Sequence, residues 1–504
     1  MSGLASKMTA LASAIAILIF SMMGSVAAAD LKVAISTNLN SLDPTTTSLG
    51  EEYVFSGLVF SGLMGTDADG HIYPDLAISW QSSPDLKTWE FKLRPNVRFH
   101  HGKPLTADDV VFTVQHILDP ATGSAGRSDL GIVEKVEAVD SVTVRFTLGT
   151  PYASFPGLLT GRQFRIVSSD RADSLKTNPS GTGPFRFVKY TPGDSVELEK
   201  NPDYYAADKI KLDRVFLRII PEAASRVAAL RAGDIDMIWN LPLETIPDLK
   251  RNADIVVDSK PSATWDALVM NNAKPPFSDV QVRRAVLLAL DKRVLVQFAL
   301  DGQGAPTHSP IAPTDPAFNT QISFEPNIAE AKRLLAQAGY PNGFKLDLIV
   351  PVGRAARERL GIATQQLLEQ VGIQINVQRM PYNRYTEEVA GVAPLYVDGF
   401  FARTVIDAAV YPWFRSNGSW NNRMWHFNSP RVDAVLDEAR RTADPEKQRD
   451  LYRQFQQYLV EDVPGVIAYV SNVATAYRST VKNYKTNPLL WLDLVGVENS
   501  RNVQ

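Results

Sequence analysis

Apolar and polar positions follow two different periods along this chain, one typical of strands and one typical of helices. Segments with the two periods alternate from one end of the chain to the other. LKVAIS (31–36), TWEFKLRPNVRFH (88–100) and SVTVRFTL (141–148) alternate apolar and polar residues as half-buried strands do. Pro192-Gly193-Asp194 interrupts a further alternating stretch, which predicts a β-hairpin. Strands separated by helical patterns are typical of an α/β fold.

The helical patterns begin at residues that cap helices. In LTADDVVFTVQHIL (105–118), Thr106 stands at the N-cap and Asp109 at the third helical position, which is the pattern of a capping box. SDVQVRRAVLLALDKRVLVQFAL (278–300) has the period of one helix, with Ser278 as the expected cap. These signals predict where helices start.

The length of the chain and two changes of pattern predict more than one structural unit. A chain of 504 residues is too long for one ordinary hydrophobic core. The pattern changes near 259–276, where extended residues meet a proline pair, and again near Tyr477–Tyr484. We therefore expect two crossings between lobes, hinged near Ala263–Asn271 and Ala476–Tyr484.

The first residues resemble an export signal. Lys7 precedes an apolar run that ends in Ala27-Ala28-Ala29, so we expect cleavage after Ala29 and a mature chain that begins at Asp30. The alternative is a membrane anchor, but Ser13, Ser21 and Gly24 interrupt the run. A signal peptide over 1–29 predicts a soluble protein of an extracytoplasmic space, most simply a Gram-negative periplasm.

Composition excludes several classes of function. Lys+Arg 52 against Asp+Glu 55 gives a net charge of −3, which offers no basic surface for nucleic acid. The chain contains no cysteine, so it has neither a thiol nucleophile nor a lipid-modified cysteine. It carries no HExxH, GxSxG, P-loop or GxGxxG motif. We therefore expect no enzyme, no catalytic residue, no cofactor and no metal, and an exported hydrolase is the least favoured hypothesis.

Four segments in order resemble one known family. They are PDLAISWQSSPDLKTWEFKLRPNVRFHHGKPLTADDVVFT (74–113), SGTGPFRFVKYTPGDSVELEKNPDYY (180–205), RVAALRAGDIDMI (226–238) and NNAKPPFSDVQVRRAVLLALDK (271–292). Together they are similar to the extracellular solute-binding proteins of family 5, the receptors of peptide, nickel-chelate and opine ABC importers. The resemblance is specific for the family and says little about the ligand.

Membership in this family implies an α/β protein of two lobes that closes on its ligand and delivers it to an inner-membrane ABC permease. The implied division is lobe I at 30–268 with an inserted subdomain at about 50–175, lobe II at 269–477, and a return to lobe I at 478–504. We expect a monomer.

The segment GFFARTVID (399–407) indicates the charge of the ligand. In dipeptide- and oligopeptide-binding relatives, an aspartate three residues after an aromatic residue pairs with the α-ammonium group of the peptide. The resemblance places Phe400 at the aromatic position and Arg403 at the aspartate. Relatives with a GR-x-DPDG pattern also carry arginine here, but this chain has Val405 and Ile406 in place of their Asp-Pro. Guanidinium is always cationic and only donates hydrogen bonds, so Arg403 favours an anionic group.

Two more arginines suggest the same charge. In RQFRIVSSDR (162–171), Arg162 matches the first arginine of an RPFR stretch that binds a carboxylate in nickel-chelate receptors, and Arg165 matches the second. Arg127 stands near another arginine of those receptors. With Arg403, we expect Arg127 and Arg162 to direct positive charge into the cleft from both lobes.

Structural alternatives stay open for all of these residues. Arg403 can instead form a bridge with Asp407 or Asp398, and Arg162 and Arg165 can be ordinary surface charges. The aromatic residues can belong to the hydrophobic core. The full set of expected ligand-binding residues is Arg403, Phe400, Phe401, Asp407, Arg162, Arg127, Trp413, Trp265, Tyr53 and His426.

We therefore predict a periplasmic receptor for a small anionic solute, such as an opine, an acidic conjugate or a polycarboxylate chelate. The alternative with the same fold is a general di- or oligopeptide receptor, which would use these arginines for the C-terminus of the peptide. An unpaired buried cation costs several kcal/mol, so arginines in a closing cleft favour a ligand with carboxylate or phosphate groups.

Overall fold

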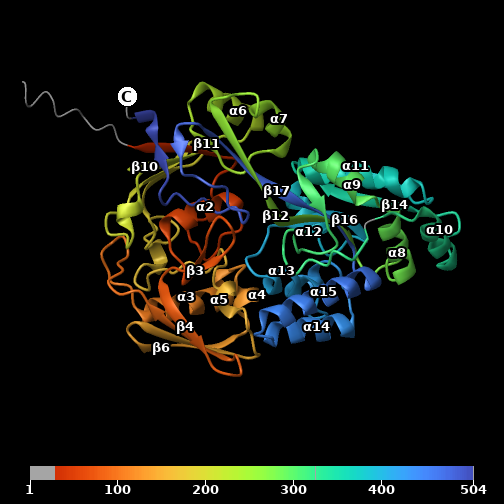
Figure 1. Cartoon of the computed structure of the whole chain (residues 1–504), viewed down its shortest axis with the longest axis horizontal. Helices are drawn as coiled ribbons and strands as arrows, with labels where there is room; N and C mark the ends of the chain where they lie inside the picture. Colours follow the sequence, from red (N-terminus) through yellow and green to blue (C-terminus); the bar gives the residue numbers. More distant parts are fainter. Residues whose placement is uncertain (1–28, 324, 503–504) are drawn as a thin grey trace, which may run out of the picture.

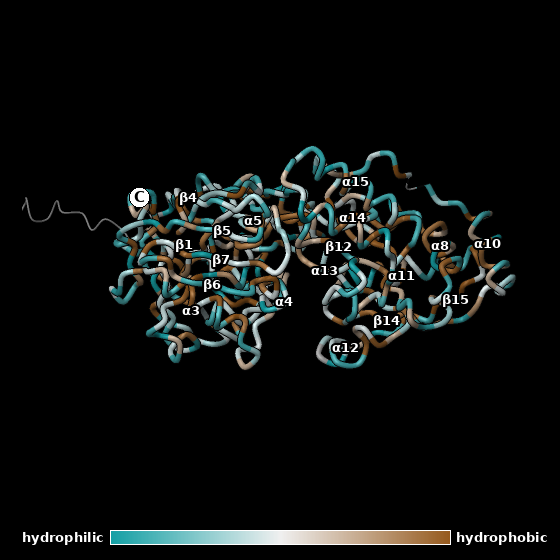
Figure 2. Tube along the Cα trace, turned by 90° about the horizontal axis from the view of Figure 1, so that it is seen from below, coloured by the Kyte–Doolittle hydropathy of each residue, from teal (hydrophilic) through white to brown (hydrophobic). Residues whose placement is uncertain are grey.

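A computed structural model describes residues 29–502 except residue 324, and it has two lobes joined by a pair of long strands (Figure 1). These strands are β12 (Ile255–Met270) and β17 (Val466–Arg478), and they pair antiparallel from Ile255 opposite Arg478 to Leu268 opposite Val466. Their pairing is irregular between Pro261 and Thr264. Seen along a perpendicular direction, the two lobes lie side by side (Figure 2). The predicted two-lobed α/β fold is confirmed.

The largest sheet extends through both lobes. Its strands are ordered β15-β14-β16-β12-β17-β11-β1-β10-β9-β8, and β13 pairs with β17 beside this path. Lobe I contributes β1 (Asp30–Ile35), β8 (Phe185–Thr191), β9 (Ser195–Lys200), β10 (Arg214–Ile219) and β11 (Met237–Ile238). Lobe II contributes β13 (Gly304–Pro306), β14 (Lys345–Pro351), β15 (Gln374–Met380) and β16 (Leu395–Phe400). The predicted strand at 31–36 and the predicted hairpin at 192–194 are thereby confirmed.

A second sheet of four antiparallel strands forms the subdomain of lobe I, in the order β4-β5-β7-β6. Its elements are β4 (Ala77–Ser82), β5 (Thr88–Leu93), β6 (Val133–Asp140), β7 (Thr143–Leu148), α3 (Ala107–Leu118), α4 (Arg127–Leu130) and α5 (Phe155–Leu158). The predicted capping box of α3 is present, since the Thr106 amide donates to the Asp109 carboxylate at 3.1 Å. The rings of Phe91, Phe146 and Phe155 pack together in a core of its own.

The remaining elements of lobe I surround its half of the large sheet. They are α2 (Gly50–Val59), β2 (Met64–Thr66), β3 (Ile72–Pro74), α6 (Ala223–Ala232), α7 (Ile246–Leu249), β18 (Val481–Lys482) and β19 (Glu498–Asn499). Short 3₁₀ helices of this lobe lie at Pro120–Thr122, Ala172–Ser174, Ala207–Lys209, Leu243–Thr245 and Ser500–Asn502, and a further one lies in lobe II at Asn421–Arg423. The C-terminal segment returns to this lobe: Trp239 Nε1 donates to the Leu490 carbonyl at 3.2 Å, and Asn499 Nδ2 donates to the Asp30 carbonyl at 2.9 Å.

Lobe II is mainly helical around its share of the sheet. Its helices are α8 (Val280–Ala289), α9 (Lys292–Leu300), α10 (Ile328–Gln337), α11 (Ala355–Glu369), α12 (Tyr382–Glu388), α13 (Ile406–Phe414), α14 (Pro430–Arg441) and α15 (Pro445–Asp462). The single helix expected at 278–300 is wrong. Asp279 rather than Ser278 caps α8, and Asp291 caps a separate helix by accepting a bond from the Arg293 amide at 2.9 Å. An aspartate that caps a new helix interrupts the old one.

Candidate functional site: a cleft between the lobes

The loop 401–405 carries the central arginine from lobe II into the cleft. It leaves β16 at Phe400, which pairs with Trp265 on β12, and enters α13 at Ile406. The strand on one side and the helix on the other therefore fix both ends of the loop. Arg403 lies in its middle and is partly buried.

This loop faces lobe I across a narrow pocket. The residues that line it are Asp129, Gly157, Leu158, Thr160, Gly161, Arg162 and Phe164 from the subdomain side, Ala402, Arg403, Thr404, Val405 and Ala408 from lobe II, and Leu489 and Trp491 from the C-terminal segment. The lobes touch here, since Val405 fills the place that a Cβ atom at Gly157 would take. The cavity volume is about 30 Å³.

A larger pocket adjoins the first and shares three of its residues. Asp129, Leu158 and Ala408 line both pockets, and the second has a cavity volume of about 230 Å³. Its other lining residues are Ser128, Ile132, Tyr152, Asp407, Tyr411, Pro412, Asn417, Gly418, Ser419 and Arg440. Both lobes contribute to both pockets, so the two together form one interlobe cleft.

The guanidinium of Arg403 has unused hydrogen-bond donors. Its guanidinium carbon lies 5.5 Å from the centre of the Trp413 ring. Within the described part of the chain it makes no hydrogen bond or ion pair, although a guanidinium carries five N–H donors. The structural bridges considered from the sequence do not form. Asp407 pairs with Arg440 at 2.5 Å, and Asp398 pairs with Arg357 at 2.7 Å.

Arg162 approaches the same pocket from lobe I. Its side chain donates to the Leu489 carbonyl at 2.7 Å, and its guanidinium carbon lies 4.9 Å from the Tyr53 ring and 5.2 Å from the Phe401 ring. Burial lowers the pKa of Arg162 to about 10, and the nearby positive charge of Arg403 acts in the same direction. Arg162 is therefore still cationic at neutral pH, so two positive charges meet in one narrow space.

Arg162 and Arg165 are not the surface charges that the sequence left open as an alternative, because each is only 7% exposed. Arg165 lies in lobe I, with its guanidinium carbon 4.2 Å from the Trp491 ring, and it lines a separate pocket. Only Arg162 of the two reaches the interlobe cleft.

Tyr53 and Phe401 form the apolar side of the Arg162 site. Tyr53 packs with Ala402, Leu489 and Trp491 in a small cluster that joins both lobes. Its hydroxyl also accepts a bond from Gln163 Nε2 at 3.1 Å, which holds the ring in place. Both aromatic residues lie beside the cleft without lining either of its pockets, so a contact with the ligand stays a prediction.

The remaining aromatic candidates support the loop from within lobe II. Trp265 and Trp413 are 3% and 1% exposed. Their rings lie 5.3 Å and 5.4 Å from the ring of Phe400, which in turn is 4.8 Å from Trp420. These residues line neither interlobe pocket, so they belong to the core that holds Arg403 in position.

Arg127 and His426 are not brought to the cleft. Arg127 is exposed and donates to the Leu118 carbonyl at 3.1 Å, so the expectation that it faces Arg403 is wrong. Two residues along α4 correspond to about 200° of rotation, which turns Asp129 inward where Arg127 points outward. His426 is exposed, with Nε2 3.3 Å from the Gly391 carbonyl.

Sequence reasoning missed two charged residues of the cleft, Asp129 and Arg440. Asp407, expected to bind ligand, instead accepts hydrogen bonds from Arg440. The Arg440 guanidinium carbon lies 3.2 Å from the centre of the Tyr411 ring and 4.7 Å from that of Tyr152 in lobe I. The Ala153 amide also donates to the Arg440 carbonyl at 2.8 Å, so the lobes meet a second time beyond the larger pocket.

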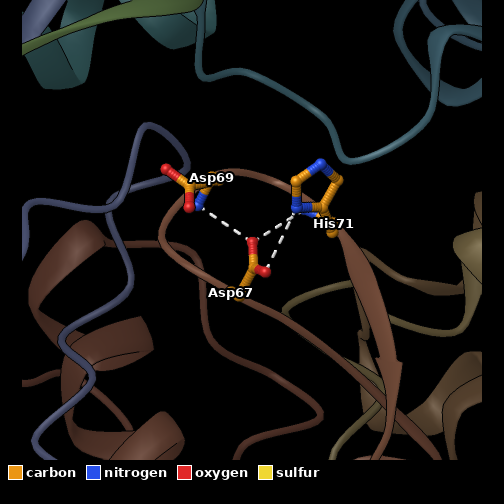
Figure 3. Close-up of side chains that lie close together, drawn as sticks. All are labelled: Asp67, Asp69 and His71. Carbon is orange, nitrogen blue, oxygen red and sulfur yellow. Dashed lines mark hydrogen bonds and ion pairs between the residues drawn. The ribbon is translucent and has the colours of Figure 1, made fainter.

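A group of three potential metal ligands lies elsewhere, in the turn between β2 and β3 (Figure 3). Asp67 Oδ1 accepts bonds from the backbone amides of Asp69 and His71, each at 2.9 Å, and Oδ2 lies 3.3 Å from His71 Nδ1. These bonds are those of an aspartate that closes a turn, and they account for the arrangement without an ion.

Comparisons with known proteins agree with the two-lobed geometry. The model for bacterial extracellular solute-binding proteins, family 5 Middle, matches residues 71–422. The glutathione-binding protein GsiB of Pectobacterium atrosepticum is 28% identical over 479 residues, which cover 92% of each chain.

Two solved structures extend the comparison. The periplasmic binding protein DppA from Helicobacter pylori, in complex with the peptide STSA, superposes with a TM-score of 0.83 at 27% identity over 94% of this chain and 99% of that one. AgaA from A. tumefaciens R10, in complex with agropinic acid, also has a TM-score of 0.83, at 26% identity over 93% and 98%. Across residues 29–502, with 324 left out, no helix is long and apolar enough to span a membrane.

Proposed function

This chain belongs to the bacterial extracellular solute-binding proteins, family 5, whose members are binding components of ABC importers and not enzymes, and we propose that it captures a small anionic solute between its lobes. An opine, an acidic conjugate or a polycarboxylate chelate has the required charge. The loaded receptor then delivers the solute to an inner-membrane permease.

The observation that carries this proposal is the unpartnered guanidinium of Arg403 beside the buried Arg162. Two cations that share a narrow space repel each other, and burial removes the water that would screen them. A carboxylate or phosphate between them would turn this repulsion into charge-assisted hydrogen bonds. Bidentate binding also suits the planar fork of an arginine better than any neutral partner.

The location of the protein is part of the same proposal. Residues 1–28 of the expected export signal lie outside the described residues, whereas β1 begins at Asp30, directly after the expected cleavage point. Homologues of this chain are periplasmic binding proteins. We infer that the mature receptor acts in the periplasm as a monomer.

A peptide receptor is the second candidate, because a peptide occupies the similar structure from Helicobacter pylori. The interlobe cavities of this chain favour a short ligand over a long peptide. The two candidates differ in the mass and in the charge of the bound compound.

Native mass spectrometry of receptor purified from its own periplasm tests the proposal. The expected spectrum contains a complex with one small compound, which carries net negative charge when released. Arg403→Ala purified in parallel should retain less of it. A co-purifying compound that is neutral or cationic would overturn the proposal, and a family of peptide masses would favour the peptide receptor.

A further inference from the structure

Asp129 places a negative charge in the cleft beside Arg403, Arg162 and the ion pair of Asp407 and Arg440. It lies in α4, is partly buried and lines both interlobe pockets. Among the residues that the structure describes, its carboxylate has no ion-pair partner, and the one side chain that hydrogen-bonds to it is the hydroxyl of Ser128. An ionised carboxylate offers about four acceptor positions, so this one has unused acceptor capacity.

The charges around Asp129 do not neutralise it locally. Burial raises the pKa of Asp129, and the positive charges of Arg403 and Arg440 act in the opposite direction without cancelling the effect. Arg440 is engaged by Asp407. Of the two arginines, Arg403 has the larger effect on the pKa of Asp129. The structure nevertheless shows no ion pair between its guanidinium and this carboxylate.

The two charges stay apart at a point where the lobes already touch. Gly157 and Val405 line the same pocket as Arg403 and Asp129, and they are already in contact. Arg403 and Asp129 therefore form no ion pair in this structure, although the lobes meet beside them. A solute with a group of each sign would bind to both.

We propose that Asp129 determines specificity by accepting hydrogen bonds from a protonated amine of the solute while Arg403 binds one of its carboxylates. The inference rests on the proposed function and narrows it. Arg162 and Arg403 supply two positive charges to the narrow pocket and Asp129 supplies one negative charge. The complementary solute carries one amine and two acidic groups, which makes it an amino dicarboxylate.

Matched pairs of probes test this assignment. L-glutamate, γ-L-glutamylglycine and γ-L-glutamyl-L-alanylglycine are each titrated beside the N-acetylated form, which keeps both carboxylates and loses the positive charge. The receptor is first freed of retained solute by unfolding, dialysis and refolding. We expect at least one amine-bearing probe to bind ten or more times tighter than its acetylated partner.

The variant Asp129→Asn should remove that preference. It should weaken binding of the amine-bearing probe about tenfold or more and leave the affinity for the acetylated probe unchanged, because only the amine loses a charged hydrogen bond. Asp108→Asn is the matched control, an exposed aspartate in α3 of the same subdomain. Melting curves verify that both variants fold.

The outcomes distinguish a failure of the role proposed for Asp129 from a failure of the anionic-solute proposal. Equal binding within every pair, a preference that survives Asp129→Asn, or no binding of any amine-bearing probe overturns the role of Asp129. If the acetylated probes bind and Arg403→Gln abolishes their binding, the anionic-solute proposal stands alone. If Arg403→Gln changes no affinity, that proposal fails as well.

Discussion

At the scale of single residues, Arg403 and Asp129 are cleft charges that form no ion pair with any residue the structure describes. Arg357, Arg440 and Arg415 each pair with aspartates at 2.5–2.9 Å. In contrast, the guanidinium of Arg403 lies over the ring of Trp413 and has no hydrogen-bonding partner in the described part of the chain. Because these other partly buried arginines of lobe II form ion pairs with aspartates, we expect Arg403 to bind a partner from outside the chain.

The carboxylate of Asp129, which has no ion-pair partner among the described residues, should destabilise the ligand-free protein at neutral pH. Its pKa is raised in the folded state, so its contribution to stability is full below the unfolded value of about 4 and is lost as the pH rises through the folded value. We predict that Asp129→Asn melts at a higher temperature than the parent at pH 7, and that the difference disappears below about pH 4. Thermal melts of ligand-free protein over this range measure it. A variant that is less stable than the parent at pH 7 would contradict the prediction.

At the scale of elements, α13 and α14 are joined by the buried pair of Asp407 and Arg440. The side chain of Asp407 is 1% exposed and that of Arg440 15%. Removal of one partner leaves a buried charge without compensation. We predict that Arg440→Met lowers the free energy of unfolding by about 3–5 kcal/mol.

A second substitution separates the ion pair from other effects of the arginine. Asp407→Asn in the Arg440→Met background removes the stranded charge, so it should recover part of the loss. Urea unfolding of both single variants and the double variant completes the cycle. Strictly additive losses would mean that the two residues do not stabilise each other.

The sequence predicted elements better than it predicted which way short elements face. The strand at 31–36 and the capping box at Thr106 follow from local pattern, and the structure confirms them. The helix at 278–300 was misjudged because its period continues through Asp291, where a new cap begins. Arg127 was misplaced for a related reason. A four-residue helix has too few positions for a period to reveal its inner face, so tertiary packing decided that Asp129 faces the cleft.

The same limit applies to Arg403. Its type and its position after two aromatic residues made it a candidate, and the structure places it in the cleft. The choice between a ligand contact and a bridge to Asp407 depended on Arg440, which is distant in sequence and appears in no local pattern.

At the scale of the whole molecule, β12 and β17 are the connection that any relative motion of the lobes must bend. The irregular pairing at Pro261–Thr264 overlaps the start of the hinge expected at Ala263–Asn271, and the second expected hinge, Ala476–Tyr484, begins at the end of β17. The lobe boundaries at 268 and 477 remain predictions. We expect small-angle scattering to show a smaller radius of gyration for the loaded receptor than for the ligand-free one. Identical profiles at saturating solute would argue against closure.

Export predicts a defined N-terminus for the whole protein. Cleavage after Ala29 would leave Asp30, whose carboxylate pairs with Arg214 at 2.6 Å at the start of β1. The intact mass of receptor from the periplasm should correspond to residues 30–504. A mass that includes 1–29 would show that the segment is retained, as a membrane anchor would be.

The central claim is that Arg403 holds an acidic group of the solute, and calorimetric titration of Arg403→Ala beside the parent tests it most directly. The titrant is the compound identified by native mass spectrometry. Charge-assisted hydrogen bonds contribute about 1.5–3 kcal/mol each, so the variant should bind about ten- to a hundredfold more weakly. Arg403→Lys should recover only part of the affinity, because an ammonium group cannot form the bidentate contact. Arg127→Ala, an exposed arginine of lobe I, serves as the control and should bind like the parent. An Arg403→Ala variant that folds normally and binds within about twofold of the parent would contradict the account.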